Sequence, residues 1–297
     1  MDKAYGEILP KIIPSISSKL SMCSFHNLCE IRFRAKRPLM LYYTDKNVYC
    51  AKNGGITKNS EDALIISEED IRKLIGLFCR SSVYAYQNEI IDGFITINGG
   101  HRIGICGTAV VENGKITNIK SFSGLNIRIA REYKGSADTS IPYIVNKERI
   151  LNTVIISPPG VGKTTMLRDI ARQLSTKFKV SIVDERSEIA SCVLGVPQFD
   201  VGVQTDVLDA YPKSQGIICA LRSLSPDVII TDEIGTEDDI FAVKSILKGG
   251  CKIITSMHGY SIDEILSKNE ELLGLFETAI LLEKRNGVPQ ITKCLNL

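Results

Sequence analysis

A glycine-bearing loop near the middle of the chain carries residue types that bind phosphate. The apolar run 153–157 leads into Pro-Pro-Gly-Val-Gly-Lys-Thr-Thr. Two glycines let backbone N–H groups close around phosphate oxygens, Lys163 can reach the outer phosphates, and the Thr164 hydroxyl can hold Mg²⁺. The pattern predicts a P-loop that binds ATP and Mg²⁺, with serine at 157 where glycine is usual. The expected phosphate-binding residues are Ser157, Pro158, Pro159, Gly160, Val161, Gly162, Lys163, Thr164 and Thr165.

A second motif places two carboxylates at the end of another apolar segment. Residues 227–233 read Asp-Val-Ile-Ile-Thr-Asp-Glu. Asp232 is the candidate for the magnesium side of the site, and Glu233 is the candidate general base that polarises the attacking water. A strand that ends in Asp-Glu is by itself more often an exposed acidic turn. The P-loop upstream favours the catalytic interpretation.

Polar side chains also follow two further apolar segments. Asp184, Glu185 and Glu188 come at the end of the run 180–184 and could order the metal or the attacking water. A solvated charge cluster explains them equally well. His258 follows the apolar run 252–256 and could sense the γ-phosphate, because neighbouring parallel strands end in the same crevice. An isolated histidine is more often structural.

An arginine from another domain or subunit often neutralises charge on a transferred phosphoryl group. Most surface arginines are merely solvated, and the sequence does not choose among the candidates. They are Arg102, Arg128, Arg131 and Arg222.

The second half of the chain has the pattern of a parallel sheet. Its apolar strands alternate with helical segments, which predicts a sheet covered on both faces and therefore a RecA-like α/β core over residues 151–297. The expected strands are 153–157, 180–184, 228–232, 252–256 and 279–283, and the expected helices follow the P-loop and include 217–224 and 240–247.

The first half predicts a smaller α+β domain over residues 1–135. Ser67 is expected to cap a helix, and Asn98-Gly99-Gly100 is expected to join two strands of a hairpin. Residues 136–150 are expected to be a linker. The expected strands are 29–43, broken by a turn at Arg37-Pro38, then 90–97, 101–111 and 121–131.

Composition agrees with a two-domain cytoplasmic protein. The chain has 297 residues, of which 44% are hydrophobic and 24% are charged. Nine cysteines without a Cys-x-x-Cys pair favour reduced thiols over disulfides or a zinc site. No apolar run approaches about 20 residues, and the N-terminus lacks the order of a signal peptide, so we expect no transmembrane segment.

The order of these motifs resembles the secretion ATPases of type II and type IV systems. Residues 220–234 resemble the signature of that family, 184–188 fall at its aspartate box, and 255–258 resemble its histidine box. Asp232 stands where those enzymes usually have glycine, and Thr236 departs from their Arg-Asp. The zinc-binding cysteine spacing of many members is absent from the sequence.

Further motifs lie at residues 32–34, 100–104, 126–128, 157–165, 183–186 and 231–235. Together they resemble the stage III sporulation AA family, and this closer resemblance covers nearly the whole length. It implies a Mg²⁺-dependent ATPase motor that energises a channel between mother cell and forespore. It also implies a hexameric ring with ATP near subunit boundaries, docked on the cytoplasmic face of membrane-embedded channel proteins.

Other function classes stay open at this point. RecA-type cores also occur in nucleic-acid-stimulated ATPases, and Arg32 and Arg34 could contact phosphate. A formal net charge of +2 makes nucleic acid an unfavourable partner. A nucleotide-regulated scaffold with little turnover would also fit the departures at Ser157 and Asp232. A GTPase is disfavoured, because no Asn/Thr-Lys-x-Asp segment follows the core strands.

Overall fold

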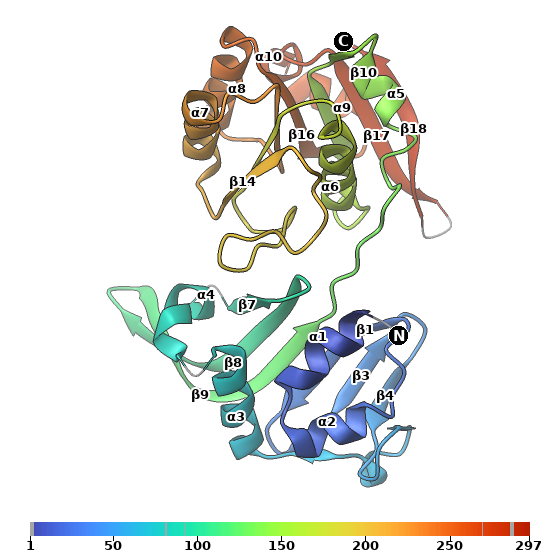
Figure 1. The fold of residues 1–297 in the computed structure, drawn as a ribbon, viewed down its shortest axis with the longest axis vertical. Coiled ribbons are helices and arrows are strands. Elements are labelled where there is room, and N and C mark those ends of the chain that lie inside the picture. The colour runs from blue at the N-terminus through green and yellow to red at the C-terminus, as the bar shows by residue number, and fades with distance from the viewer. Residues whose placement is uncertain (1–2, 81, 92, 269, 286–287) are drawn as a thin grey trace. The chain divides into compact units, whose positions relative to one another are not determined.

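The computed structural model describes residues 3–80, 82–91, 93–268, 270–285 and 288–297. The chain divides into two compact units, Met1–Arg131 and Glu132–Leu297. The N-terminal unit has one hydrophobic core and the C-terminal unit has two, one on each face of its sheet. Figure 1 shows the elements of both units.

The N-terminal unit is built on an antiparallel sheet with the strand order β5-β4-β3-β1-β9-β8-β7. Alternate residues of β1 face the core, so Ile31 and Phe33 are fully buried. The longest strands, β8 and β9, form a hairpin (Figure 1). The strands are β1 (Leu28–Arg34), β3 (Met40–Tyr43), β4 (Asn47–Cys50), β5 (Ile56–Thr57), β7 (Phe94–Ile97), β8 (His101–Glu112) and β9 (Lys115–Arg128).

Helices pack on this sheet and bury their apolar residues in the same core. The predicted helix cap at Ser67 is confirmed, because its hydroxyl accepts the Asp70 N–H at 3.0 Å while the Asp70 carboxylate accepts the Ser67 N–H at 2.9 Å. This reciprocal pair satisfies two N–H groups at the helix start. The helices are α1 (Lys3–Ile8), α2 (Pro14–Leu20), α3 (Glu68–Phe78) and α4 (Gln87–Ile91), with 3₁₀ turns at Leu9–Lys11, Ser60–Asp62 and Val83–Tyr86.

Two predictions for this unit are wrong. The turn expected at Arg37-Pro38 lies one residue earlier, where Lys36 has a φ of 60°. Arg37–Pro38 is instead the short strand β2, paired with β6 (Ile65–Ile66). The strand expected from residue 90 begins only at Phe94, because Ile90 reaches the core from helix α4. A short apolar run does not distinguish a helix from a strand by its period.

The C-terminal unit contains the predicted parallel sheet. Its order is β14-β13-β15-β16-β12-β17-β18, with all neighbouring strands parallel except β17 and β18. The strands are β12 (Thr153–Ser157), β13 (Val180–Asp184), β14 (Thr205–Asp209), β15 (Val228–Thr231), β16 (Lys252–His258), β17 (Thr278–Arg285) and β18 (Val288–Asn296).

Helices cover both faces of this sheet. Ile155 of β12 packs in one core with α6, while Val154 and Ile156 pack in the other core with α7 and α8. Successive residues of a strand point to opposite faces, which explains why the central strands are apolar throughout. The helices are α6 (Lys163–Leu174), α7 (Lys213–Ser223), α8 (Glu237–Lys248), α9 (Ile262–Lys268) and α10 (Glu270–Leu273).

Residues 136–150 were expected to be a linker, but in the structure they are part of the C-terminal unit. They form α5 (Ile141–Ile144), β10 (Val145–Asn146) and β11 (Arg149–Ile150). Ala137, Ile144 and Ile150 are buried in the core beneath α6. These apolar side chains anchor the segment, although Gly135 and Pro142 resemble linker residues.

Asp169 of α6 fastens this segment to the core. Its carboxylate accepts hydrogen bonds from the Ala137 N–H at 2.9 Å, Arg172 Nε at 2.7 Å and Gln173 Nε2 at 3.0 Å. Burial alone would raise the pKa of Asp169, but these hydrogen bonds outweigh burial and lower it. A lowered pKa means that the ionised carboxylate stabilises the folded state.

Asp169→Asn is therefore expected to reduce the free energy of unfolding at pH 7 by about 1–3 kcal/mol. The contribution is complete above the unfolded pKa of about 3.9 and is lost as the pH falls through the lower folded pKa, so the difference from wild type should shrink in acid. Urea unfolding at pH 7 and at low pH measures this, with exposed Asp206→Asn as control. Equal stability of Asp169→Asn and wild type at pH 7 would contradict the assignment.

Candidate functional site

The P-loop joins the end of β12 to the start of α6. Gly160 and Gly162 have φ values of 73° and 118°, which favour glycine. A Cβ at Gly162 would also lie 3.0 Å from Cγ of Pro289. Ser157 is still within the strand, so the conformational freedom of glycine is not needed at that position.

Lys163 is buried at the base of this loop. Its ammonium donates to the carbonyl oxygen of Ser157 at 3.0 Å and to that of Pro158 at 3.4 Å. It also contacts Nδ1 of His258 at 2.9 Å. Burial lowers the pKa of Lys163, and the nearby carboxylates of Glu233 and Asp232 partly offset this effect.

Thr164 and Asp232 bring oxygen atoms together beside the loop. The Thr164 hydroxyl donates to Oδ2 of Asp232 at 2.9 Å, while Oδ1 accepts the Glu233 N–H at 3.0 Å and the Ser256 hydroxyl. Thr164 lies in the first turn of α6, Asp232 and Glu233 directly follow β15, and Ser256 lies in β16. Hydroxyl and carboxylate oxygens are ligands that Mg²⁺ prefers, so this donor set fits the metal.

His258 connects Lys163 to Glu233. Its Nε2 lies 2.6 Å from Oε1 of Glu233, opposite the Nδ1 contact with Lys163. An ammonium group can only donate, so Nδ1 must accept and the ring proton must sit on Nε2, facing the carboxylate. The histidine predicted from its place at a strand end thus lies between the P-loop lysine and the candidate base.

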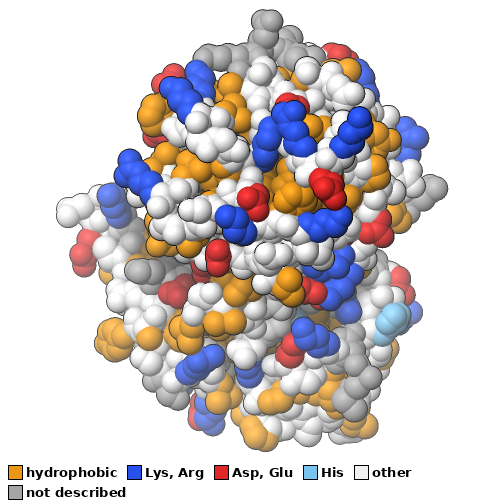
Figure 2. Space-filling view, turned by 45° about the horizontal axis from the view of Figure 1, so that its top comes forward, with side chains coloured by type: hydrophobic (Ala, Val, Ile, Leu, Met, Phe, Trp, Pro, Cys, Tyr) orange, Lys and Arg blue, Asp and Glu red, His pale blue; other side chains and the backbone are white. Residues whose placement is uncertain are grey.

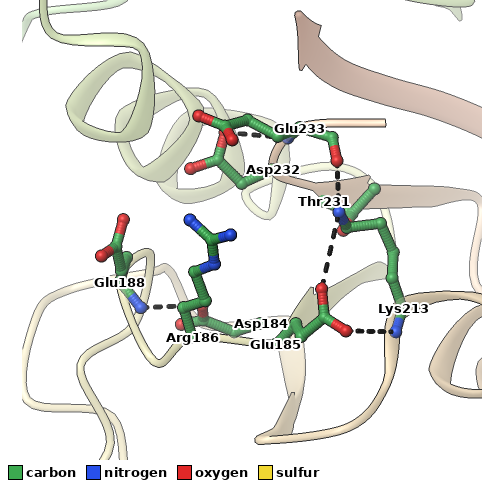
Figure 3. Close-up of a pocket in the computed structure, with 8 residues that line it drawn as sticks. All are labelled: Asp184, Glu185, Arg186, Glu188, Lys213, Thr231, Asp232 and Glu233. Atoms are coloured by element: carbon green, nitrogen blue, oxygen red, sulfur yellow. Dashed lines mark hydrogen bonds and ion pairs between the residues drawn. The ribbon is translucent and has the colours of Figure 1, made fainter. Parts of the chain in front are cut away.

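A pocket opens between the ends of β13 and β15 (Figure 3). Figure 3 shows the Arg186 side chain extending toward Asp232, while Lys213 reaches across to Glu185 and the backbone of Glu233. Arg186 and Lys213 were not among the residues predicted to act. The lining residues are Asp184, Glu185, Arg186, Glu188, Lys213, Thr231, Asp232 and Glu233.

Asp184 shapes the loop that borders this pocket. Its carboxylate accepts the N–H groups of Glu188 and Ala190, each at 2.8 Å, and only 2% of the residue is exposed. Burial raises the pKa of Asp184, and the backbone hydrogen bonds oppose that rise. Its oxygens are thus occupied by the loop, whereas Glu185 faces Lys213.

The candidate arginines lie in different surroundings. Arg222 is exposed in the last turn of α7, about 13 Å along the helix from the pocket residue Lys213. Arg102 stacks 4.5 Å from the centroid of the Phe94 ring. Arg131 donates to the carbonyl oxygens of Phe25 and Leu28. Arg102, Arg128 and Arg131 belong to the N-terminal unit, and their part in the site stays a prediction.

Solved structures with this arrangement define the class of the fold. The structure is similar to the pilus retraction motor PilT with bound ADP, at a TM-score of 0.62 and 14% identity over 98% of this chain and 83% of that chain. It is also similar to the Legionella pneumophila ATPase DotB, at a TM-score of 0.56 and 17% identity, over 95% of this chain and 79% of that chain. These similarities confirm the RecA-like fold of secretion ATPases, preceded by a smaller α+β domain.

Sequence comparison narrows the class to a family. The model for Sporulation stage III, protein AA, matches residues 5–295. Stage III sporulation protein AA of Bacillus subtilis (strain 168) is 38% identical over 269 residues, which cover 89% of this chain and 83% of that protein. The chain therefore belongs to the Sporulation stage III, protein AA family. Among its described residues, no helix combines the length and apolarity needed to cross a bilayer.

Proposed function

We propose that this chain is a Mg²⁺-dependent ATP hydrolase and the motor of a secretion-like channel complex in endospore formation. The observation that carries the proposal is the meeting of Lys163 and Thr164, at the start of α6, with Asp232 and Glu233, which follow β15. These side chains provide a phosphate-binding cation, oxygen ligands and a carboxylate base within one site.

In the proposed reaction, backbone N–H groups of residues 160–165 and the Lys163 ammonium would hold the phosphates of ATP. Thr164 and Asp232 would hold Mg²⁺, which would supply positive charge to neutralise the phosphate oxygens. Glu233 accepts a proton from the water that attacks the γ-phosphorus, and ADP leaves as inorganic phosphate forms. His258, which contacts both Lys163 and Glu233, is placed to report whether a γ-phosphate has engaged the lysine.

Family membership supports the finer parts of the proposal. We propose a hexameric ring on the cytoplasmic face of membrane-embedded channel proteins, on the mother-cell side. Arg102, Arg128 or Arg131 from the N-terminal unit, or Arg222, would complete an ATP site of the same or a neighbouring subunit. Hydrolysis would change the angle between units. Glu185 and Glu188 would help to order water in the pocket.

The charge on one face of the molecule does not favour nucleic acid as a partner. On the face drawn in Figure 2, Lys and Arg side chains are interspersed with Asp, Glu and hydrophobic side chains. A phosphate-backbone track needs clustered positive charge.

Phosphate release by the purified chain tests the proposed activity. We expect turnover that requires Mg²⁺ and is unchanged by single-stranded DNA or RNA, together with a rise in solution mass when a non-hydrolysable ATP analogue is added. Strong stimulation by nucleic acid would support the nucleic-acid ATPase instead. Nucleotide binding without turnover would identify a scaffold.

A further inference from the structure

Lys213 ties three segments of the site together. It is the first residue of α7, and only 12% of its side chain is exposed. Its ammonium donates to the backbone carbonyl oxygen of Glu233 and lies 3.7 Å from Oε2 of Glu185. Its own N–H donates to Oε1 of Glu185 at 3.4 Å. The end of β13, the start of α7 and the end of β15 therefore meet at this side chain (Figure 3).

The carbonyl that Lys213 holds belongs to a residue in a strained conformation. Glu233 has a φ of 31°, which is rare for a residue with a side chain. Such a conformation is unfavourable and persists only where the surroundings impose it. Here the Glu233 N–H is held by Oδ1 of Asp232 and by the Ser256 hydroxyl, at 3.0 and 3.2 Å. Lys213 holds the other end of the residue.

We infer that Lys213 is a positioning residue for hydrolysis, which fixes the backbone of Glu233 so that its carboxylate is held beside His258 and the P-loop. The inference rests on the proposed role of Glu233 as the base. Without the Lys213 hydrogen bond, only the N–H side of Glu233 stays fixed, and the backbone can relax to an unstrained φ. The Glu233 carboxylate then moves away from the position at which it would accept a proton from the attacking water.

A simpler role for Lys213 is to neutralise charge, since five carboxylates line the same pocket. That role predicts lower stability and altered nucleotide affinity after removal of the charge. The positioning role instead predicts a loss in kcat with KM unchanged, because a displacement of about 1 Å in a reacting group can cost about 10²-fold in rate. The two roles therefore differ in the parameter that changes.

The experiment compares full-length wild type with Lys213→Met, Glu233→Gln and the double variant. Lys252→Met is the matched control, because Lys252 is also partly buried and pairs with a carboxylate, that of Glu277. Lys252 is the first residue of β16, at the end of the strand away from His258. We expect Lys213→Met to lower kcat for ATP by about 10- to 100-fold. KM and the Kd for ADP should stay as in wild type, and Lys252→Met should keep the wild-type kcat.

Epistasis shows whether Lys213 acts through Glu233. If it does, the double variant should hydrolyse ATP no more slowly than Glu233→Gln alone. Multiplying losses, or a wild-type kcat for Lys213→Met, would overturn the inference while leaving the proposed function intact. Absence of turnover in wild type would instead refute the proposed function. If Lys213→Met fails to fold, Lys213→Arg, which keeps the charge but moves the donor, must lower kcat with KM unchanged or the inference fails.

Discussion

Glu233→Gln is expected to lower kcat for ATP hydrolysis by about 10²- to 10⁴-fold, the usual contribution of a general base. The amide keeps the shape of the side chain but cannot accept the proton of the attacking water. Lys163, Thr164 and Asp232 are unchanged, so the Kd for ADP and Mg²⁺ should stay near the wild-type value. Phosphate release and calorimetric titration measure the two quantities separately.

Glu237→Gln is the matched control for this variant. Glu237 is an exposed acid in the first turn of α8, four positions beyond Glu233 and outside the pocket lining. The Glu237→Gln protein should hydrolyse ATP at the wild-type rate. A Glu233→Gln protein that does the same would remove Glu233 from the catalytic role.

Lys163→Met is expected to weaken ADP binding by about 10²-fold and to abolish measurable turnover at ordinary ATP concentrations. The ammonium would contribute charge-assisted hydrogen bonds to phosphate oxygens, each worth about 1.5–3 kcal/mol, and about 1.4 kcal/mol corresponds to a tenfold change in Kd. Methionine fills the buried space but donates no hydrogen bond. Isothermal titration with ADP and Mg²⁺ measures the change.

The control for the loss of ADP binding is a lysine near the other end of α6. Lys177 follows α6 and is exposed, so Lys177→Met should bind ADP like wild type. Thermal unfolding of both variants separates a binding defect from misfolding, because Lys163 also bonds the carbonyl oxygens of Ser157 and Pro158. Unchanged ADP affinity in a folded Lys163→Met protein would show that the loop does not bind phosphate.

The sequence predicts the centre of this site because parallel strands impose its layout. Thr164 lies just beyond the loop that follows β12, Asp232 follows β15, and His258 ends β16. Parallel strands present their carboxyl ends at one edge. The contacts of Asp232 with Thr164 and of His258 with Lys163 are what that rule anticipates. The fold class follows from the same alternation of apolar strands and helices.

Residues outside this rule were harder to foresee. Lys213 acts on a backbone carbonyl, which no side-chain pattern reveals, and the apolar spacing placed the start of its helix only at residue 217. β14 was missed because this edge strand is largely polar and only Leu208 is buried. β18, another edge strand, contains Pro289, a residue tolerated only at such edges.

The choice among the candidate arginines depends on more than local pattern. Arg102 and Arg131 have partners within the N-terminal unit, such as Phe94 and the carbonyl of Phe25, that the sequence does not reveal. Which arginine meets ATP depends on the placement of units and subunits, which is set by surfaces rather than by strand periodicity. Their assignment therefore stays a prediction.

A single-turnover experiment tests the central claim, that this chain hydrolyses ATP at the site formed by Lys163, Asp232 and Glu233. The full chain, in excess over ATP labelled at the γ-phosphate, is mixed with Mg²⁺ and quenched over time, so that product release and repeated cycling do not affect the result. The predicted result is conversion of bound label to inorganic phosphate by wild type and its retention as ATP by Glu233→Gln. If wild type binds the labelled ATP but the label stays in ATP, the claim that this chain hydrolyses ATP is contradicted.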